Sequence, residues 1–99
     1  MDKKDIFLLT KPPQSDRGKL CLQLIEQSEN PVLYLAADGV YNLLDAASLN
    51  ELPLKRILAC KEDLQARGVQ AGEQVIVPDN FYELLVGEMM SEGSRIYTL

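Results

Sequence analysis

The sequence predicts an α/β fold, namely a three-layer α/β/α sandwich around a mostly parallel five-stranded sheet. Short apolar runs of the β type alternate with amphipathic helical patterns along the whole chain, and the connections between them are only a few residues long. The chain has 99 residues, of which 46% are hydrophobic, and this is enough material for one core. We therefore expect residues 1–99 to form a single domain.

Two strands and two helices are expected in the first half of the chain. Residues 6–10 are apolar on both faces, as a buried parallel strand is, and prolines end this run. Ser15 is expected to cap a helix that ends near Ser28. The buried face of that helix is expected to carry Leu20, Cys21, Leu24 and Ile25. Residues 32–36 form the second expected strand, and residues 40–47 form a short helix.

Three strands and two helices are expected in the second half. The strands cover residues 55–59, 74–77 and 95–99. One helix is expected over residues 61–67, with Gly68 following its last turn. The last helix starts after Asn80, whose side chain is expected to form a capping box with Glu83. Its apolar face is expected to hold Phe81, Leu84, Leu85 and Met89.

The carboxyl ends of the parallel strands are where ligand-binding or catalytic groups are expected to gather. The residues at these ends are Thr10, Asp38, Cys60 and Pro78. No glycine occurs between Leu9 and Arg17, so the first loop is neither a dinucleotide-binding loop nor a Walker A loop. The carboxylates of a phosphoacceptor domain are also missing from their expected places.

Composition excludes several classes of site. The chain contains no histidine and only two cysteines, Cys21 and Cys60, which excludes Ser-His-Asp triads, Cys-His dyads and histidine metal sites. We therefore expect no metal and no cofactor. Residues 21–99 hold five bases and twelve acids, so direct contact with nucleic acid is not expected.

The location expected from the sequence is the cytoplasm. No apolar run approaches the ~20 residues that span a bilayer, so no membrane association is expected. The residues that follow Met1 lack the apolar segment and the small-residue cleavage site of a signal peptide.

Cys60 is the most reactive-looking residue, because it directly precedes an expected helix. Free backbone N–H groups and the helix dipole at that position stabilise a thiolate. Lys61 would add to this effect, whereas Glu62 and Asp63 would oppose it. The alternative is a buried structural cysteine. Cys21 lies on the apolar face of the first expected helix, where a core or interface role is expected from spacing alone.

Several motifs resemble one known family. Residues 57–69 resemble the strand-Cys-helix-Arg-Gly motif of the DsrE/DsrF/DsrH sulfur-relay superfamily, whose fold is Rossmann-like. Other matching features make the chain most similar to the DsrH/TusB branch over nearly its whole length. These are Lys11-Pro12, Asp38-Gly39-Val40, Asp63-Leu64-x-Ala66-Arg67-Gly68 and Asp79-x-Phe81.

The resemblance implies a cytosolic sulfur-relay protein that accepts and passes persulfide sulfur through a cysteine, as a sulfurtransferase or a sulfur carrier. Such relays serve the formation of 2-thiouridine in tRNA or sulfur oxidation. The implied partners are DsrE- and DsrF-like proteins in a homo- or hetero-oligomer, with persulfide donor and acceptor proteins. Cys60 matches the active cysteine of the DsrE and TusD branches, and Cys21 matches the first-helix cysteine of DsrH proteins.

Two alternatives to sulfur transfer stay open at this point. TusB proteins lack both cysteines and act as structural subunits, so the chain is alternatively a non-catalytic subunit of a DsrE/F/H-type oligomer. A weaker alternative is a small-ligand site in the crevice around Thr10, Asp38 and Cys60. Solvent exposure of the two sulfur atoms is expected to discriminate between the cysteines.

Overall fold

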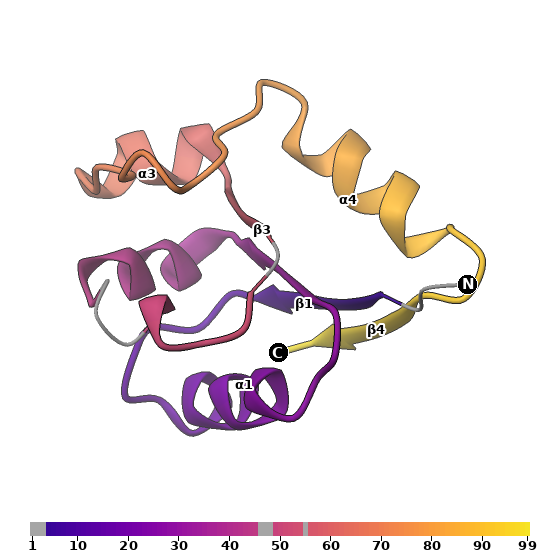
Figure 1. Ribbon diagram of the computed structural model, residues 1–99. Helices are drawn as coiled ribbons and strands as arrows, with labels where there is room; N and C mark the ends of the chain where they lie inside the picture. Colours follow the sequence, from indigo (N-terminus) through magenta and orange to yellow (C-terminus); the bar gives the residue numbers. More distant parts are fainter. Residues whose placement is uncertain (1–3, 46–48, 55) are drawn as a thin grey trace.

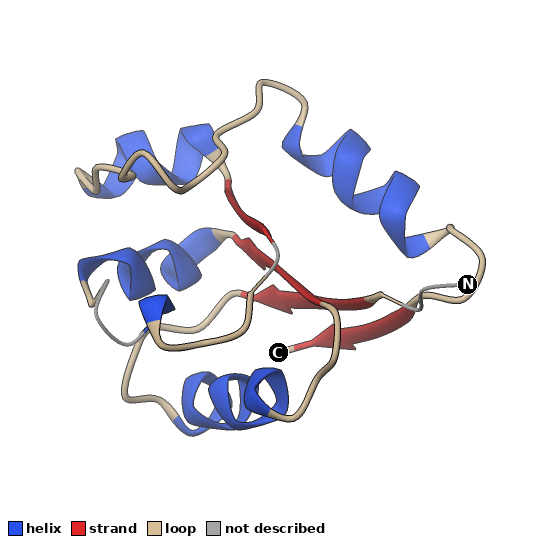
Figure 2. Ribbon diagram, viewed as in Figure 1, coloured by secondary structure: helices blue, strands red, loops and turns tan. Residues whose placement is uncertain are grey.

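The computed structural model describes residues 4–45, 49–54 and 56–99. Within these residues it contains four strands and four helical elements (Figures 1 and 2). The strands are β1 (Asp5–Leu9), β2 (Pro31–Leu35), β3 (Arg56–Ala59) and β4 (Arg95–Thr98). The helical elements are α1 (Asp16–Glu26), the 3₁₀ helix η1 (Ala37–Leu44), α3 (Lys61–Arg67) and α4 (Phe81–Met89).

The four strands form one parallel sheet in the order β3-β2-β1-β4. In the register of this sheet Leu9 pairs with Leu35, and Leu35 pairs with Ala59. The strands β1, β2 and β3 therefore end at the same edge. The loops that follow these three strands lie together at that edge, as the sequence predicts for a parallel sheet.

Helices cover both faces of the sheet, which confirms that part of the prediction. Figure 1 shows α1 on one side of the sheet and α4 on the other. One core cluster joins Cys21 and Ile25 of α1 to strand residues such as Phe7. The second joins Phe81 and Leu85 of α4 to strand residues on the opposite face. Successive residues of β1 alternate between the two clusters because side chains alternate across a strand.

The predicted fifth strand over residues 74–77 is wrong. In the described part of the chain this segment makes one isolated parallel bridge, between Ile76 and Leu58. The N–H of Ile76 donates to the carbonyl of Ile57, and the carbonyl of Ile76 accepts from Ala59, both at 2.9 Å. A turn closed by Val75 N–H on the Gly72 carbonyl precedes Ile76, and Pro78, which has no N–H, follows two residues later. The extended stretch is therefore too short to form a ladder.

The helix ends test the capping predictions. Ser15 caps α1 as predicted, because its Oγ accepts from the N–H of Gly18 at 3.0 Å. Gly68 follows α3 in the left-handed conformation, with φ of 65°. The capping box at Asn80 is wrong. The Asn80 side chain makes no capping bond, and its φ of −115° and ψ of 47° lie outside the extended region that a capping residue needs.

One other helix differs in its bounds from the prediction. The second helix is the 3₁₀ helix η1 and begins directly after β2, three residues earlier than predicted; its predicted last residues, 46 and 47, lie outside the described residues. Gly39 N–H donates to the Ala36 carbonyl at 2.8 Å, and this tight turn starts the helix early. The predicted first residue of the third strand, Lys55, also lies outside the described residues.

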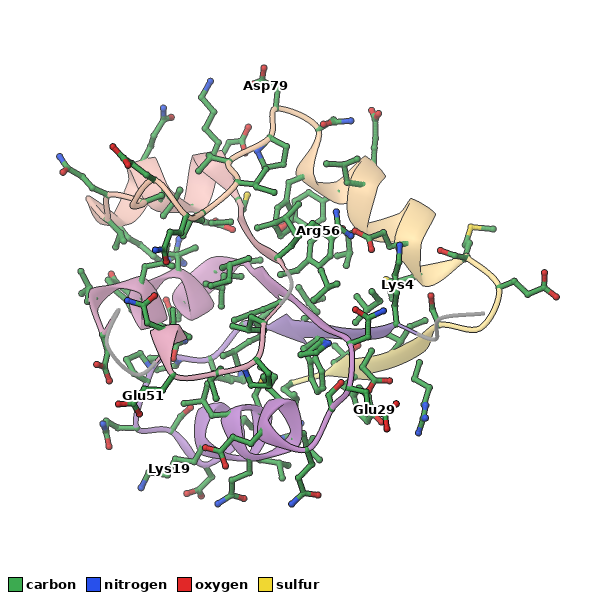
Figure 3. The ribbon with its side chains drawn as sticks, viewed as in Figure 1. Lys4, Lys19, Glu29, Glu51, Arg56 and Asp79 are labelled. Atoms are coloured by element: carbon green, nitrogen blue, oxygen red, sulfur yellow. The ribbon has the colours of Figure 1, made fainter. Side chains whose placement is uncertain are left out.

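Glu88 fastens α4 to the sheet. Its carboxylate accepts a hydrogen bond from the buried Tyr34 hydroxyl and forms an ion pair with Arg56, with Nη2 and Oε2 at 2.6 Å. Lys4 lies 3.8 Å away from the same oxygen. The side chains of Lys4 and Arg56 extend toward α4 in Figure 3. One carboxylate on α4 therefore joins groups from β2, from β3 and from the residue that precedes β1.

Glu88→Ala is expected to lower the free energy of unfolding by about 1–3 kcal/mol, because it leaves the buried Tyr34 hydroxyl without its acceptor. Chemical denaturation followed by circular dichroism measures this value. Glu83→Ala, on the exposed side of the same helix, is the matched control and should change stability by less than about 0.5 kcal/mol. Equal losses in the two variants would contradict a fastening role for Glu88.

Candidate functional site

Cys60 lies where the sequence predicts it, at the carboxyl end of β3 and at the N-cap of α3. Its backbone is fixed on both sides. The N–H donates to the Leu35 carbonyl, and its own carbonyl accepts from the N–H of Leu64, both at 3.0 Å. The residue is 2% exposed. The sulfur is therefore held at the edge of the sheet by both β2 and α3.

Above Cys60 lies an open depression of about 360 Å³. Its walls come from the first turn of α3 and from the start of α4 with the loop before it. It is lined by Cys60, Glu62, Asp63, Asp79, Asn80, Phe81, Tyr82 and Glu83. Four of these eight residues are acidic, so the surface around the thiol is strongly negative. Asp79 lies at the outer tip of the loop before α4, as Figure 3 shows.

The Cys60 thiol is a poor acid in this environment. Burial raises the pKa of the Cys60 thiol, and the Asp63 and Glu62 side chains raise it further, whereas the backbone N–H of Asp63 lowers it. The Cys60 Sγ donates to Glu62 Oε2 at 3.4 Å. The prediction that the helix start stabilises a Cys60 thiolate is therefore wrong. The helix N–H effect is present, but burial and the carboxylates outweigh it.

The Lys61 side chain pairs with a carboxylate rather than supporting a Cys60 thiolate as predicted. Its Nζ pairs with Asp79 Oδ1 at 3.3 Å across the rim of the depression. A lysine at the first position of a helix points away from the helix axis, and a carboxylate on the facing loop satisfies it there. The Cys60 sulfur instead donates to the Glu62 carboxylate.

Cys21 lies in the core and is 0% exposed. It packs from the middle of α1 against the face of the sheet that carries Phe7 and Leu33. Burial raises the pKa of its thiol to about 12. Both cysteines are thus buried, and exposure alone does not rank them. Their locations do, because Cys60 borders an open depression and Cys21 packs in the core.

The other residues predicted at the strand ends have structural partners. Thr10 donates through its N–H and its hydroxyl to the Leu99 carbonyl, at 3.0 and 2.9 Å. Asp38 accepts from Arg67 Nε at 3.1 Å. Neither residue, nor Pro78, is among those that line the depression at Cys60. Within the described part of the chain, the depression at Cys60 is therefore not lined by the two other residues of the expected crevice, Thr10 and Asp38.

Sequence reasoning missed a charged network beside Cys60, which we call the Arg67 clamp and which consists of Asp38, Asp63 and Arg67. Arg67 pairs with Asp38 at 3.1 Å and, through Nη1, with Asp63 Oδ1 at 3.3 Å. Asp63 Oδ2 accepts from the N–H of Ala37 at 2.8 Å. The ion pair between Asp63 and Arg67 could have been predicted from the sequence, because residues four apart are neighbours on a helix. The contact with Asp38 depends on the parallel order of β2 and β3.

Among the described residues, no three or more Asp, Glu or Cys side chains are placed to hold a metal ion. None of the helices in the same residues is long and apolar enough to cross a membrane.

The family model described as "DsrH like protein" matches residues 11–91. The matched span includes both cysteines, the Arg67 clamp and the depression at Cys60. No curated protein matches the chain.

Proposed function

This chain belongs to the DsrH-like family of the DsrE/F/H sulfur-relay superfamily, and on that premise we propose that it relays persulfide sulfur through Cys60. The observation that carries this proposal is the location of Cys60. It is the cysteine that borders an open depression, at a strand end and at the start of a helix. Cys21 has the same chemistry but packs in the core, and it is the second candidate for a sulfur carrier.

The transfer step needs only thiol chemistry. The Cys60 thiol gives its proton to a base, for which the Glu62 carboxylate at 3.4 Å is in place. The thiolate then attacks the outer sulfur of a donor persulfide, R–S–S–H. A new S–S bond forms at Cys60 while the donor S–S bond breaks, and the electron pair leaves on the inner donor sulfur, which takes up a proton. The products are Cys60–S–S–H and R–SH, with no net oxidation.

Partners follow from the family rather than from the chain itself. DsrH-like proteins typically form complexes with DsrE and DsrF. We extend this to the present chain as a subunit of such an assembly in the cytoplasm, with separate proteins that give and receive the sulfur. Persulfide transfer of this kind serves tRNA thiolation or sulfur oxidation, and the two differ in the acceptor protein.

The test is incubation with glutathione persulfide followed by intact-mass analysis. Wild type and Cys21→Ser are expected to gain about 32 Da for each sulfur carried, and Cys60→Ser is expected to gain nothing. Peptide mapping then locates the added sulfur. Gain in Cys60→Ser but not in Cys21→Ser would transfer the role to Cys21, and gain in none of the three forms would refute sulfur carriage.

A second candidate function, a non-catalytic subunit, is favoured by a specific observation. Burial raises the pKa of the Cys60 thiol, and the Asp63 and Glu62 carboxylates raise it further, which suits a structural residue. In that case the variant that lacks both cysteines should still co-purify with DsrE- and DsrF-like partners and support their sulfur transfer. Loss of transfer with assembly intact would exclude this function.

A further inference from the structure

Asp63 occupies a special position in α3. It is the third residue after the N-cap Cys60, where a carboxylate ordinarily reaches back to the N–H of the capping residue. That N–H is already used, because Cys60 donates to the Leu35 carbonyl at 3.0 Å. The Asp63 carboxylate reaches sideways instead and accepts from Ala37 at 2.8 Å. It thus caps the start of η1 rather than its own helix.

The first residue of η1, which Asp63 caps, is strained. Ala37 has a φ of 49°, which lies in the left-handed region that residues other than glycine seldom adopt. The hydrogen bond from its N–H to Asp63 helps to hold that conformation. Arg67, one helical turn after Asp63, then bridges Asp63 to Asp38 in the first turn of η1. The Arg67 clamp therefore fixes where the Asp63 carboxylate lies.

Asp63 is also one of the groups that act on the Cys60 thiol. Burial is the largest cause of the raised pKa of that thiol, the Asp63 backbone N–H lowers the pKa, and the Asp63 carboxylate raises it, while Glu62 from the same helix accepts from Sγ. The pKa of the Tyr82 hydroxyl on α4 is raised by burial first and then by the nearby Cys60. Asp79 and Glu83 complete the charged lining, and the base at its rim, Lys61, is paired with Asp79.

We propose that Arg67 is a positioning residue for Cys60 that acts through Asp63. Its guanidinium holds the Asp63 carboxylate against the start of η1 and balances the negative charge that this carboxylate presents to the thiol. The proposal rests on the proposed function, in which Cys60 is the group that must ionise. In this proposal the arginine of the Arg-Gly pair controls the reactivity of the cysteine seven residues earlier. It does so indirectly, because Arg67 pairs with carboxylates and not with the sulfur.

Three variants separate this role from a merely structural one. Arg67→Ala leaves the charge of Asp63 unbalanced, so the pKa of the Cys60 thiol rises and alkylation at fixed pH slows by about threefold. Asp63→Asn removes that charge but keeps an acceptor for Ala37, so alkylation becomes faster. Arg67→Lys retains the charge and should recover part of the wild-type rate.

The experiment measures alkylation of Cys60 by iodoacetamide between about pH 7 and pH 10, with peptide mapping and with circular dichroism to verify the fold. The double variant is decisive, because coupled residues do not add. In the Asp63→Asn background, Arg67→Ala should have no further effect on the alkylation profile. An unchanged profile in Arg67→Ala, or an equal slowing in both backgrounds, would overturn the proposal. Alkylation uses no persulfide, so a failure of sulfur loading leaves this result independent.

Discussion

Gly39→Ala is expected to lower the free energy of unfolding by about 3 kcal/mol or more, the largest effect of any single substitution considered. A Cβ at position 39 would lie 1.9 Å from the carbonyl oxygen of Leu9 and 2.8 Å from its carbonyl carbon. Both are backbone atoms at the end of β1, and the same oxygen accepts from the N–H of Ala36 at 3.2 Å. It cannot move away without breaking the sheet edge. Chemical denaturation of the variant measures the loss.

Gly87→Ala is the matched control for that substitution. Gly87 lies in α4, and a Cβ built there meets nothing within 4 Å. Alanine in a helix interior should therefore stabilise the protein by about 0.5–1 kcal/mol. A Gly39→Ala variant as stable as wild type would show that η1 does not approach the end of β1 closely enough to exclude a Cβ.

The Cys21 thiol is expected to make the protein lose stability in alkaline solution. Burial raises the pKa of Cys21 from an ordinary value of 9.0 to about 12. The folded state therefore keeps its proton where the unfolded state has lost it. The stabilisation is fully present below about pH 9 and is lost as the pH rises toward 12, at a rate of about 1.4 kcal/mol per pH unit and about 4 kcal/mol in total.

Denaturation at about pH 8, 9.5 and 10.5 of wild type, Cys21→Ala and Cys21→Val measures this effect. Other groups titrate in this range, including Tyr34, whose pKa burial also raises, so the quantity of interest is the difference from wild type. Both variants lack the thiol but differ in packing. The two variants should therefore differ from each other in free energy of unfolding at about pH 8. Relative to wild type, both should lack the same pH-dependent part of that free energy. A wild-type slope in both variants would contradict the assignment.

The sequence predicted the elements well where local patterns decide them. The helix over residues 61–67 has the predicted bounds, because acidic residues begin it and Gly68 ends it. The prediction of a strand over residues 74–77 was wrong although the apolar pattern is present. The turn at Gly72 and the proline at position 78 leave one residue, Ile76, able to pair. Pattern shows which face of a segment is apolar, but not how long the segment stays extended.

The candidate site was predicted in position but not in chemistry. The place of Cys60 between strand and helix follows from sequence order. The direction in which its pKa shifts does not follow from sequence order, because the shift depends on burial and on which way Lys61, Glu62 and Asp63 point. The Lys61 side chain turned to Asp79, 18 residues later in the chain, and no local pattern specifies that pair.

By itself, then, the sequence determined the family, the parallel α/β fold and the location of Cys60 at a strand end, since these follow from residue order and from periodicity. Only the tertiary structure decided that Cys60 is buried beneath an acidic depression, that Cys21 packs in the core, and that Arg67 joins Asp63 to Asp38. The physical reason is that pKa values and ion pairs depend on the groups that folding brings near. At Cys60 these come from α3, from α4 and from the sheet edge, which lie far apart in the chain.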